Sequence, residues 1–156
     1  MIKVNLQMRI FKHMAVLAAF FALLGLVGCD KDEVRISYGK LPSAARVFIE
    51  AYFPNETCNY AEQEKDDGRK EYKAVLSNGT EIVFDASGQW TEVDCKFSLL
   101  PAGIVPQRIV EDVSVRYPGA GMYKVERAMG GYEISIGSGL ELIYSADGTF
   151  IREEHW

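Results

Sequence analysis

Few side chains in this 156-residue sequence could carry catalysis. A serine or cysteine nucleophile needs a neighbouring base, which is most often histidine. Of the two histidines, His13 lies in a basic N-terminal segment and His155 is the penultimate residue, where side chains are poorly held. Because no nucleophile has an evident base, we expect a protein that is not an enzyme.

A short acidic stretch is the strongest candidate for a metal site. It contains Glu62, Glu64, Asp66 and Asp67, and carboxylates are ligands that calcium prefers. Calcium loops, however, space their ligands through defined turns, and this stretch lacks that spacing. We therefore interpret it as a solvated hairpin loop and expect no metal site and no cofactor.

Two cysteines, Cys58 and Cys95, follow the N-terminal region. They fall in the first and fourth predicted strands of one sheet, which are not neighbours in a simple meander. Their Cα atoms would then lie beyond the ~7 Å that a disulfide can bridge. We expect two partly buried free thiols, and a disulfide stays open as the alternative.

Charge is distributed unevenly along the chain. Residues 1–28 hold three of the 17 Lys and Arg residues and no acid, so residues 29–156 carry 14 basic against 22 acidic side chains, a net charge of −8. Nucleic-acid binding needs a basic footprint, and attraction to anionic lipid needs basic clusters. The composition therefore excludes both as partners of the main domain.

The N-terminal segment predicts a lipoprotein signal peptide over residues 1–28. A basic start is followed by 14 uncharged residues, 14–27, too few to span the ~30 Å hydrocarbon core as a helix. The segment ends in Leu26-Val27-Gly28-Cys29, which resembles the bacterial lipobox. Cys29 would then accept the lipid, and membrane contact would be through this anchor alone.

The residues after Cys29 form a predicted tether, 29–37. Within it, Lys31, Asp32 and Glu33 resemble the surface-export signal of Bacteroidetes lipoproteins. We expect an outer-membrane lipoprotein exposed on the cell surface, and a periplasm-facing lipoprotein is the alternative. A plain charged tether is the simpler interpretation of the same residues.

The rest of the chain is interpreted as a tandem repeat. Leu41-Pro42 and Phe53-Pro54 correspond to Val105-Pro106 and Tyr117-Pro118 at an offset of 64 residues. Residues 72–90 then align with residues 132–150 at an offset of 60, without a gap. The connection between the two matched segments is therefore four residues shorter in the second copy.

Each copy predicts one helix followed by four antiparallel strands. The helix lies between the two prolines of its copy and has an apolar stripe every four residues. The following strands alternate apolar and polar residues, and Asn78-Gly79 is typical of a hairpin turn. We expect an α+β fold in which both copies form one roughly eight-stranded antiparallel sheet, with the helices on one face.

The other sheet face is predicted to be in water and is a candidate docking surface. It would carry Lys73, Val75, Ser77, Val83, Asp85, Glu133, Ser135, Glu141 and Ile143. The aromatics Trp90 and Phe150 occupy equivalent places after the second turn of each copy. They either cap the hydrophobic layer or anchor a partner. The candidate partner-binding residues are Trp90, Phe150, Val75, Val83 and Ile143.

The order of these motifs resembles one family. Residues 90–96, Leu100-Pro101 to Pro106, Tyr117-Pro118-Gly119, residues 131–134 and residues 139–142 are similar to the β-lactamase-inhibitor-like, PepSY-like proteins of Bacteroidetes envelopes. The resemblance covers residues 38–156 and implies a PepSY-like repeat at 38–97 and another at 98–156. It also implies a fold similar to the tandem-repeat β-lactamase inhibitor protein. It transfers no catalytic residues, and fold does not imply function.

Two functions remain from different classes. The first is a non-enzymatic binding module of the envelope that inhibits or regulates a protease or hydrolase by binding it as a protein partner. The second is a small-ligand, glycan or peptide binder. An apolar-aromatic patch on the sheet face would favour the first, and a deep pocket with convergent polar groups would favour the second.

Overall fold

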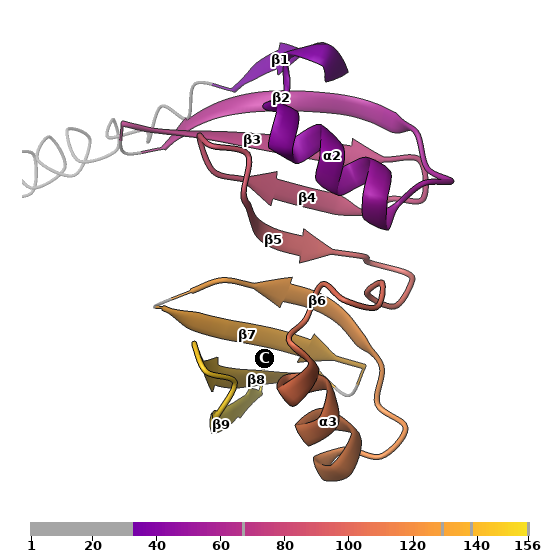
Figure 1. Ribbon diagram of the computed structural model, residues 1–156, viewed down its shortest axis with the longest axis vertical. Coiled ribbons are helices and arrows are strands. Elements are labelled where there is room, and N and C mark those ends of the chain that lie inside the picture. The colour runs from indigo at the N-terminus through magenta and orange to yellow at the C-terminus, as the bar shows by residue number, and fades with distance from the viewer. Residues whose placement is uncertain (1–32, 67, 129, 138, 156) are drawn as a thin grey trace, which may run out of the picture. The chain divides into compact units, whose positions relative to one another are not determined.

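The computed structural model describes residues 33–66, 68–128, 130–137 and 139–155 (Figure 1). The predicted signal peptide, the predicted lipid acceptor Cys29 and two of the predicted export residues, Lys31 and Asp32, lie outside the described residues. Glu33 is described and is exposed just before the first strand. None of the helices in the described part has the length and hydropathy that a membrane-spanning helix requires.

The described residues form one antiparallel sheet of nine strands in simple sequence order (Figure 1). Its strands are β1 (Val34–Ile36), β2 (Cys58–Asp66), β3 (Arg69–Leu76), β4 (Glu81–Phe84), β5 (Trp90–Asp94), β6 (Met122–Glu126), β7 (Gly131–Ile136), β8 (Leu140–Ser145) and β9 (Phe150–His155). The predicted α+β class with an antiparallel sheet is confirmed.

The ninth strand is β1, which lies inside the segment predicted to be a tether. Its three residues pair with the middle of β2, with Val34 opposite Gln63 and Ile36 opposite Ala61. The sequence pattern did not indicate β1, because three residues are too few to show a period of two. A 3₁₀ turn, η2 (Tyr38–Lys40), connects β1 to the first helix.

Both helices lie on the same side of the sheet (Figure 1). They are α2 (Ser43–Tyr52), followed along the chain by β2–β5, and α3 (Gln107–Arg116), followed by β6–β9. Each begins directly after a proline in extended conformation, Pro42 or Pro106. A proline at this position loses no hydrogen bond, since the first helical N–H groups have no partner within the helix.

The core fills the space between the helices and the sheet. The helices contribute Ala45, Ile49, Ile109 and Val113, and each of these is at most 3% exposed. The strands add every second residue, such as Ile82, Ile134 and Leu142, at 0%. All belong to one cluster of packed side chains, so the two helix-and-strand units share a continuous core.

A glycine allows the turn that joins β4 to β5 to pack closely against the start of α2. Gly88 has a φ of 85°, and an added Cβ atom would lie 2.7 Å from the Cβ atom of Pro42. Only glycine fits, because it tolerates positive φ and has no Cβ atom to meet the helix.

The acidic stretch near residue 65 is part of a hairpin and not the predicted loop. Strands β2 and β3 stay paired as far as Asp66 opposite Arg69. A turn at Gly68, with a φ of 79°, closes the hairpin, so Glu62 and Glu64 are strand residues. The sequence analysis predicted too long a loop, because the charged residues of this hairpin show none of the apolar alternation that indicates a strand.

Candidate functional site

The sheet face opposite the helices, called the open face below, carries two rows of side chains that cross strands β3 to β8. Strand register defines these rows. One row is Lys73, Val83, Glu92, Glu126, Glu133 and Ile143, and the other is Val75, Glu81, Asp94, Lys124, Ser135 and Glu141. The open face is therefore mostly charged.

On strands β3 to β5, the charges of the open face are balanced by ion pairs. Glu81 lies 3.6 Å from both Lys73 and Lys96, and Lys96 also lies 2.7 Å from Asp94. The side chain of Asp94 is only 12% exposed. These contacts join neighbouring strands, and they leave few charges without a partner at this end of the open face.

Farther along the sheet, the open face carries more acids than bases. We define the acidic cluster as Glu92, Glu126, Glu133 and Glu141, which lie on strands β5 to β8. Lys124 is shared by Glu92 at 3.2 Å and Glu126 at 3.8 Å. In the part of the chain that the structure describes, no ion pair joins Glu133 or Glu141 to a basic side chain.

Burial, together with repulsion within the acidic cluster, raises the pKa of one member, Glu126. Burial raises the pKa of Glu126, and the charges of Glu92, Glu133 and Glu141 raise it further, against the opposing effect of Lys124. Burial works against the charge of Lys124, but Glu92 and Glu126 outweigh it and raise the pKa of the lysine. The acidic cluster therefore stabilises a positively charged group that lies next to it.

A hollow lies beside the acidic cluster on the open face. Its volume is about 330 Å³, and it is lined by Asp94, Tyr123, Lys124, Ser135 and Glu141. Ser135 is 5% exposed, although the sequence pattern placed it on a face in water. The neighbouring side chains are long, and they cover the short serine between them.

The three aliphatic residues predicted to bind a partner do lie on the open face, but they form no exposed apolar patch. Val75 and Ile143 are each 9% exposed, and Val83 is half-buried. Charged residues stand beside them in the rows, for example Lys73 next to Val83 and Glu133 next to Ile143. Long charged side chains can cover apolar neighbours in this way.

The predicted aromatic pair lies on the helix side, so the structure does not bring all five candidate residues together. Trp90 is 7% exposed and its ring is 6.2 Å from that of Phe48. Phe150 lies 5.6 Å from Tyr144. A bulge directly after each aromatic, at Thr91 or Ile151, places the aromatic opposite a core residue, Phe84 or Tyr144, which sets its side chain on the helix face.

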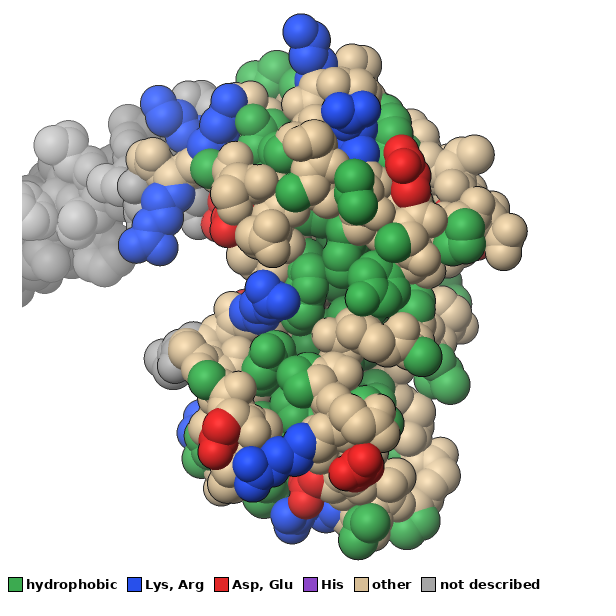
Figure 2. Space-filling model, in the orientation of Figure 1, with side chains coloured by type: hydrophobic (Ala, Val, Ile, Leu, Met, Phe, Trp, Pro, Cys, Tyr) green, Lys and Arg blue, Asp and Glu red, His purple; other side chains and the backbone are tan. Residues whose placement is uncertain are grey.

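Arginines cover both aromatic rings. The guanidinium of Arg127 lies 3.9 Å from the ring centroid of Trp90, and that of Arg116 lies 3.9 Å from the centroid of Phe150. Figure 2 shows this side of the protein, where hydrophobic side chains gather between α2 and α3 and charged side chains are scattered around them.

Both described cysteines are free thiols, as the sequence analysis expected. Cys58 opens β2 and Cys95 follows β5, so strands β3 and β4 lie between them. Burial raises the pKa of each thiol. Raised pKa values keep both sulfurs protonated at neutral pH, which makes them weak nucleophiles.

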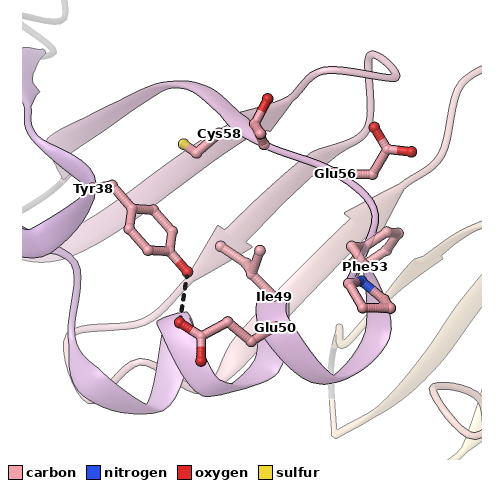
Figure 3. A pocket seen from close by; sticks show the side chains of 8 residues that line it. Tyr38, Ile49, Glu50, Phe53, Glu56 and Cys58 are labelled. Atoms are coloured by element: carbon pink, nitrogen blue, oxygen red, sulfur yellow. Dashed lines mark hydrogen bonds between the residues drawn. The ribbon is translucent and has the colours of Figure 1, made fainter.

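A second hollow opens at the edge of the sheet (Figure 3). This edge cavity has a volume of about 470 Å³ and lies between α2, Tyr38 and the start of β2. Its lining residues are Tyr38, Ile49, Glu50, Phe53, Pro54, Glu56, Thr57 and Cys58. The Tyr38 hydroxyl donates a hydrogen bond to Glu50 at 3.4 Å. The sequence analysis missed this site because its lining residues come from three separate elements.

Two exposed apolar residues were also missed. Phe97 is 93% exposed and Leu99 is 66% exposed, in the segment that links β5 to α3. The sequence did contain a sign of them: two large apolar residues stand in a predicted loop, and loops are usually polar. Both residues add apolar surface at one end of the sheet. Phe97 lies beside the β3–β4 turn there, since an added Cβ atom at Gly79 would be 3.7 Å from the Phe97 ring.

Comparison with protein families places the chain beside a described family. A model described as "Putative beta-lactamase-inhibitor-like, PepSY-like" matches residues 70–152. The sequence matches none of the curated proteins with which it was compared.

Solved structures with the same fold come from Bacteroides. A "putative periplasmic protein" of Bacteroides vulgatus is 35% identical with a TM-score of 0.77, covering 82% of this chain and 100% of its own. A "putative calcium-regulated periplasmic protein" of Bacteroides thetaiotaomicron is 32% identical with the same score and coverage. A second Bacteroides vulgatus periplasmic protein "of unknown function" is 33% identical with a TM-score of 0.76, covering 78% of this chain and 98% of its own.

Proposed function

Because the chain belongs to the PepSY-like, beta-lactamase-inhibitor-like family, we propose that it is a binding protein of the cell envelope and not an enzyme. Its open face binds a protein partner that presents Lys or Arg side chains. In the finer form of this proposal, the two PepSY-like repeats, 38–97 and 98–156, are arranged as in the β-lactamase inhibitor protein. The partner is then an envelope protease or hydrolase that is inhibited or regulated.

The observation that carries the proposal is the excess of carboxylates on the open face. Glu133 and Glu141 have no basic partner among the described residues, and the charge of each raises the pKa of Glu126. Holding like charges together costs folding free energy. Lys or Arg side chains of a partner would relieve this repulsion, and complementary charge also speeds association and rejects acidic partners.

The test compares wild-type chain with two double variants in affinity capture from envelope extract, followed by photo-crosslinking from position 123, where a half-buried tyrosine lines the hollow of the open face. Glu133→Gln with Glu141→Gln removes two carboxylates from the open face. Glu111→Gln with Glu153→Gln removes two exposed carboxylates from the helix side of the sheet as a control. We expect that the open-face variant loses the crosslinked partner, that the helix-side variant keeps it, and that the crosslinked surface is rich in Lys and Arg.

The same experiment can contradict the proposal. A partner that binds both double variants equally, or that crosslinks through an acidic surface, would exclude the open face as a basic-protein site. Raising the salt concentration should weaken a genuine complex, because charge attraction between exposed groups is screened over about 8 Å at physiological ionic strength.

The proposal includes a lipid anchor and export to the surface. The relatives are described as periplasmic, which supports an envelope location. Lipidation at Cys29 and surface export through Lys31, Asp32 and Glu33 are additional steps. Cys29→Ala should abolish fatty-acid labelling, and labelling that persists would contradict the anchor. Alanine at the three charged positions should remove protease accessibility on intact cells at unchanged protein level.

The edge cavity favours the second candidate function, ligand or peptide binding, because it combines buried apolar side chains with carboxylates. The calcium regulation named for one relative has less support in this chain. In the described residues, no group of three or more His, Cys, Asp or Glu side chains is arranged to hold a metal ion.

A further inference from the structure

We propose that an extended peptide segment binds along the free edge of β2 at Cys58–Tyr60 and places a Lys or Arg side chain in the edge cavity. This site lies at one edge of the sheet, between the sheet and α2 (Figure 3). The acidic cluster lies on strands β5 to β8, so the proposal stands independently of the open-face function.

The backbone edge of β2 is only partly covered. Strand β1 pairs with Ala61, Glu62 and Gln63 and ends there, while β2 itself begins at Cys58. In the described part of the chain, residues 58–60 thus have a strand partner on the β3 side and none on the other. An uncovered strand edge is a template for an added strand, and many domains bind extended peptides in this way.

The second helix-and-strand unit shows what occupies the corresponding edge there. At the offset of 64 residues, Cys58 corresponds to Met122 in β6. The carbonyl oxygen of Met122 accepts a hydrogen bond from the Leu100 N–H at 2.9 Å, and that of Tyr123 accepts one from the Cys95 N–H at 2.8 Å. The occupant of that edge is therefore protein backbone, supplied by the chain itself.

Side chains of the same segment lie against that edge in the second unit. Leu100 packs against the hydrophobic core. An added Cβ atom at Gly121 would lie 2.4 Å from a Cδ atom of Leu99, so Leu99 sits directly on this glycine. At the corresponding place in the first unit, Thr57 and Cys58 line the edge cavity.

The cavity's chemistry defines the side chain that fits. Its floor is apolar, with Ile49 at 3% exposure and Phe53 at 6%. Glu50 and Glu56 contribute carboxylates to its lining, and the structure describes no Lys, Arg or His side chain in that lining. A lysine or arginine has an aliphatic stem that suits the floor and a charged end that suits the carboxylates. Its backbone would continue the sheet beside β2.

The experiment selects ligands without assuming their sequence. A displayed library of random heptapeptides is panned against the full chain, and the selected peptides are titrated against variants by fluorescence polarisation. The test variant is Glu50→Gln. The matched controls are Glu111→Gln, on an exposed position of the other helix, and the open-face pair Glu133→Gln with Glu141→Gln.

We expect the selected peptides to share one Lys or Arg and to bind Glu50→Gln about tenfold more weakly, the loss typical of one charged hydrogen bond. Both controls should bind as the wild type does. A bound peptide should also slow alkylation of Cys58 by iodoacetamide, measured on its tryptic peptide, because the thiol lines the cavity. N-methylation of the peptide backbone beside the basic residue should abolish binding.

Several results would overturn the proposal. Selection of no peptides, or of peptides without a basic residue, would exclude the stated ligand. Equal binding to Glu50→Gln, or unchanged alkylation of Cys58, would exclude the cavity. Loss of binding only in the open-face pair would move the site to the acidic cluster, and would support the proposed function while contradicting this inference.

Discussion

The two helix-and-strand units differ most in what lies beside their first long strand. In the second unit, β6 is covered along its edge by β5, Cys95 and Leu100. In the first unit, the described part of the chain covers β2 on this side only with the three residues of β1. The first strand of the second unit, β6, is covered by the last strand of the first unit, β5. The first unit has no unit before it in the described sheet, so its strand β2 is covered by the short strand β1. The difference leaves one edge and one cavity available for binding.

The same comparison applies to the charges on these strands. Glu62 and Glu126 correspond at the offset of 64 residues. Glu62 has a partner of its own on β1, since Arg35 lies 3.4 Å away, whereas Glu126 shares Lys124 with Glu92. Equivalent positions in the sequence thus have different electrostatic surroundings, because their neighbours come from different strands.

The largest expected effect tests whether the two units unfold together. Ile82 and Leu142 correspond at the offset of 60, and both are 0% exposed. Ile82→Ala and Leu142→Ala should each lower the free energy of unfolding by about 2–5 kcal/mol. Because one core and one sheet join the units, both should shift the same single transition in urea.

Two probes measure that transition, far-UV circular dichroism and the fluorescence of Trp90 in a Trp156→Phe background. Leu142→Ala should shift the Trp90 signal as much as Ile82→Ala does, although Trp90 belongs to the first unit. Ile151→Ala, at a residue that is 54% exposed, is the control with little effect. Separate transitions by the two probes would show that the units are independent.

The next effect concerns the turns that approach the helices. Gly148→Ala should cost about 1–2 kcal/mol, the usual penalty for a side chain at positive φ. Gly88→Ala should cost more, because its Cβ atom would lie 2.7 Å from Pro42, whereas the closest atom at Gly148 is 3.4 Å away. Urea denaturation of both variants checks the order, and equal costs would mean that α2 shifts to make room.

A smaller effect is expected on the open face at Ser135. The sequence pattern placed this residue in water, where Ser135→Asp would be almost neutral. At 5% exposure, the added carboxylate would lie between Lys124 and Glu141. Because Glu92 and Glu126 already share Lys124, this lysine offsets only part of the burial and repulsion of the new charge, and the variant should lose about 1–3 kcal/mol of stability. Ser135→Asn is the matched uncharged control. Denaturant titration measures the stability of both variants. Wild-type stability in both would contradict the burial of Ser135.

The smallest expected effect is a difference between Glu62 and Glu126 in how pH changes the stability gained or lost on their substitution. The pKa of Glu126 is raised in the folded protein, so the folded state binds the proton more tightly. Stability therefore falls as pH rises from the ordinary value of 4.5 through the raised pKa of the folded state. Glu126→Gln should therefore slightly raise the melting temperature at pH 7, and the gain should vanish below the ordinary value.

Glu62→Gln is the matched variant and should give no such gain, because it removes the partner of Arg35. Thermal melts of both variants between about pH 3.5 and about pH 8, a range that includes the titration of ordinary and raised carboxyl groups, measure the difference. A gain for Glu62→Gln as large as that for Glu126→Gln would contradict the assigned charge environments.

The sequence alone predicted most elements of this fold. Proline spacing and apolar periodicity give both helices, and Asn78-Gly79 gives the β3–β4 hairpin. These features are local, so a stretch of a few residues contains the whole signal. The β2–β3 hairpin was misjudged at residues 64–70, where charged strand residues carry no alternation.

The candidate sites depended on contacts between distant residues. Local pattern correctly separated Val75, Val83 and Ile143 from the helix face, but it could not show that neighbouring charged side chains leave two of them 9% exposed. The bulges that turn Trp90 and Phe150 toward the helices also depend on strand pairing, which single-strand periodicity does not contain.

Composition and spacing by themselves determined the class of this protein: an acidic α+β domain without a visible catalytic pair. Only the tertiary structure decided which carboxylates lack a basic partner and which strand edge stays uncovered. The physical reason is that charge balance and edge coverage are set by cross-strand neighbours. Glu62 and Arg35 are 27 positions apart in the sequence and 3.4 Å apart in the sheet.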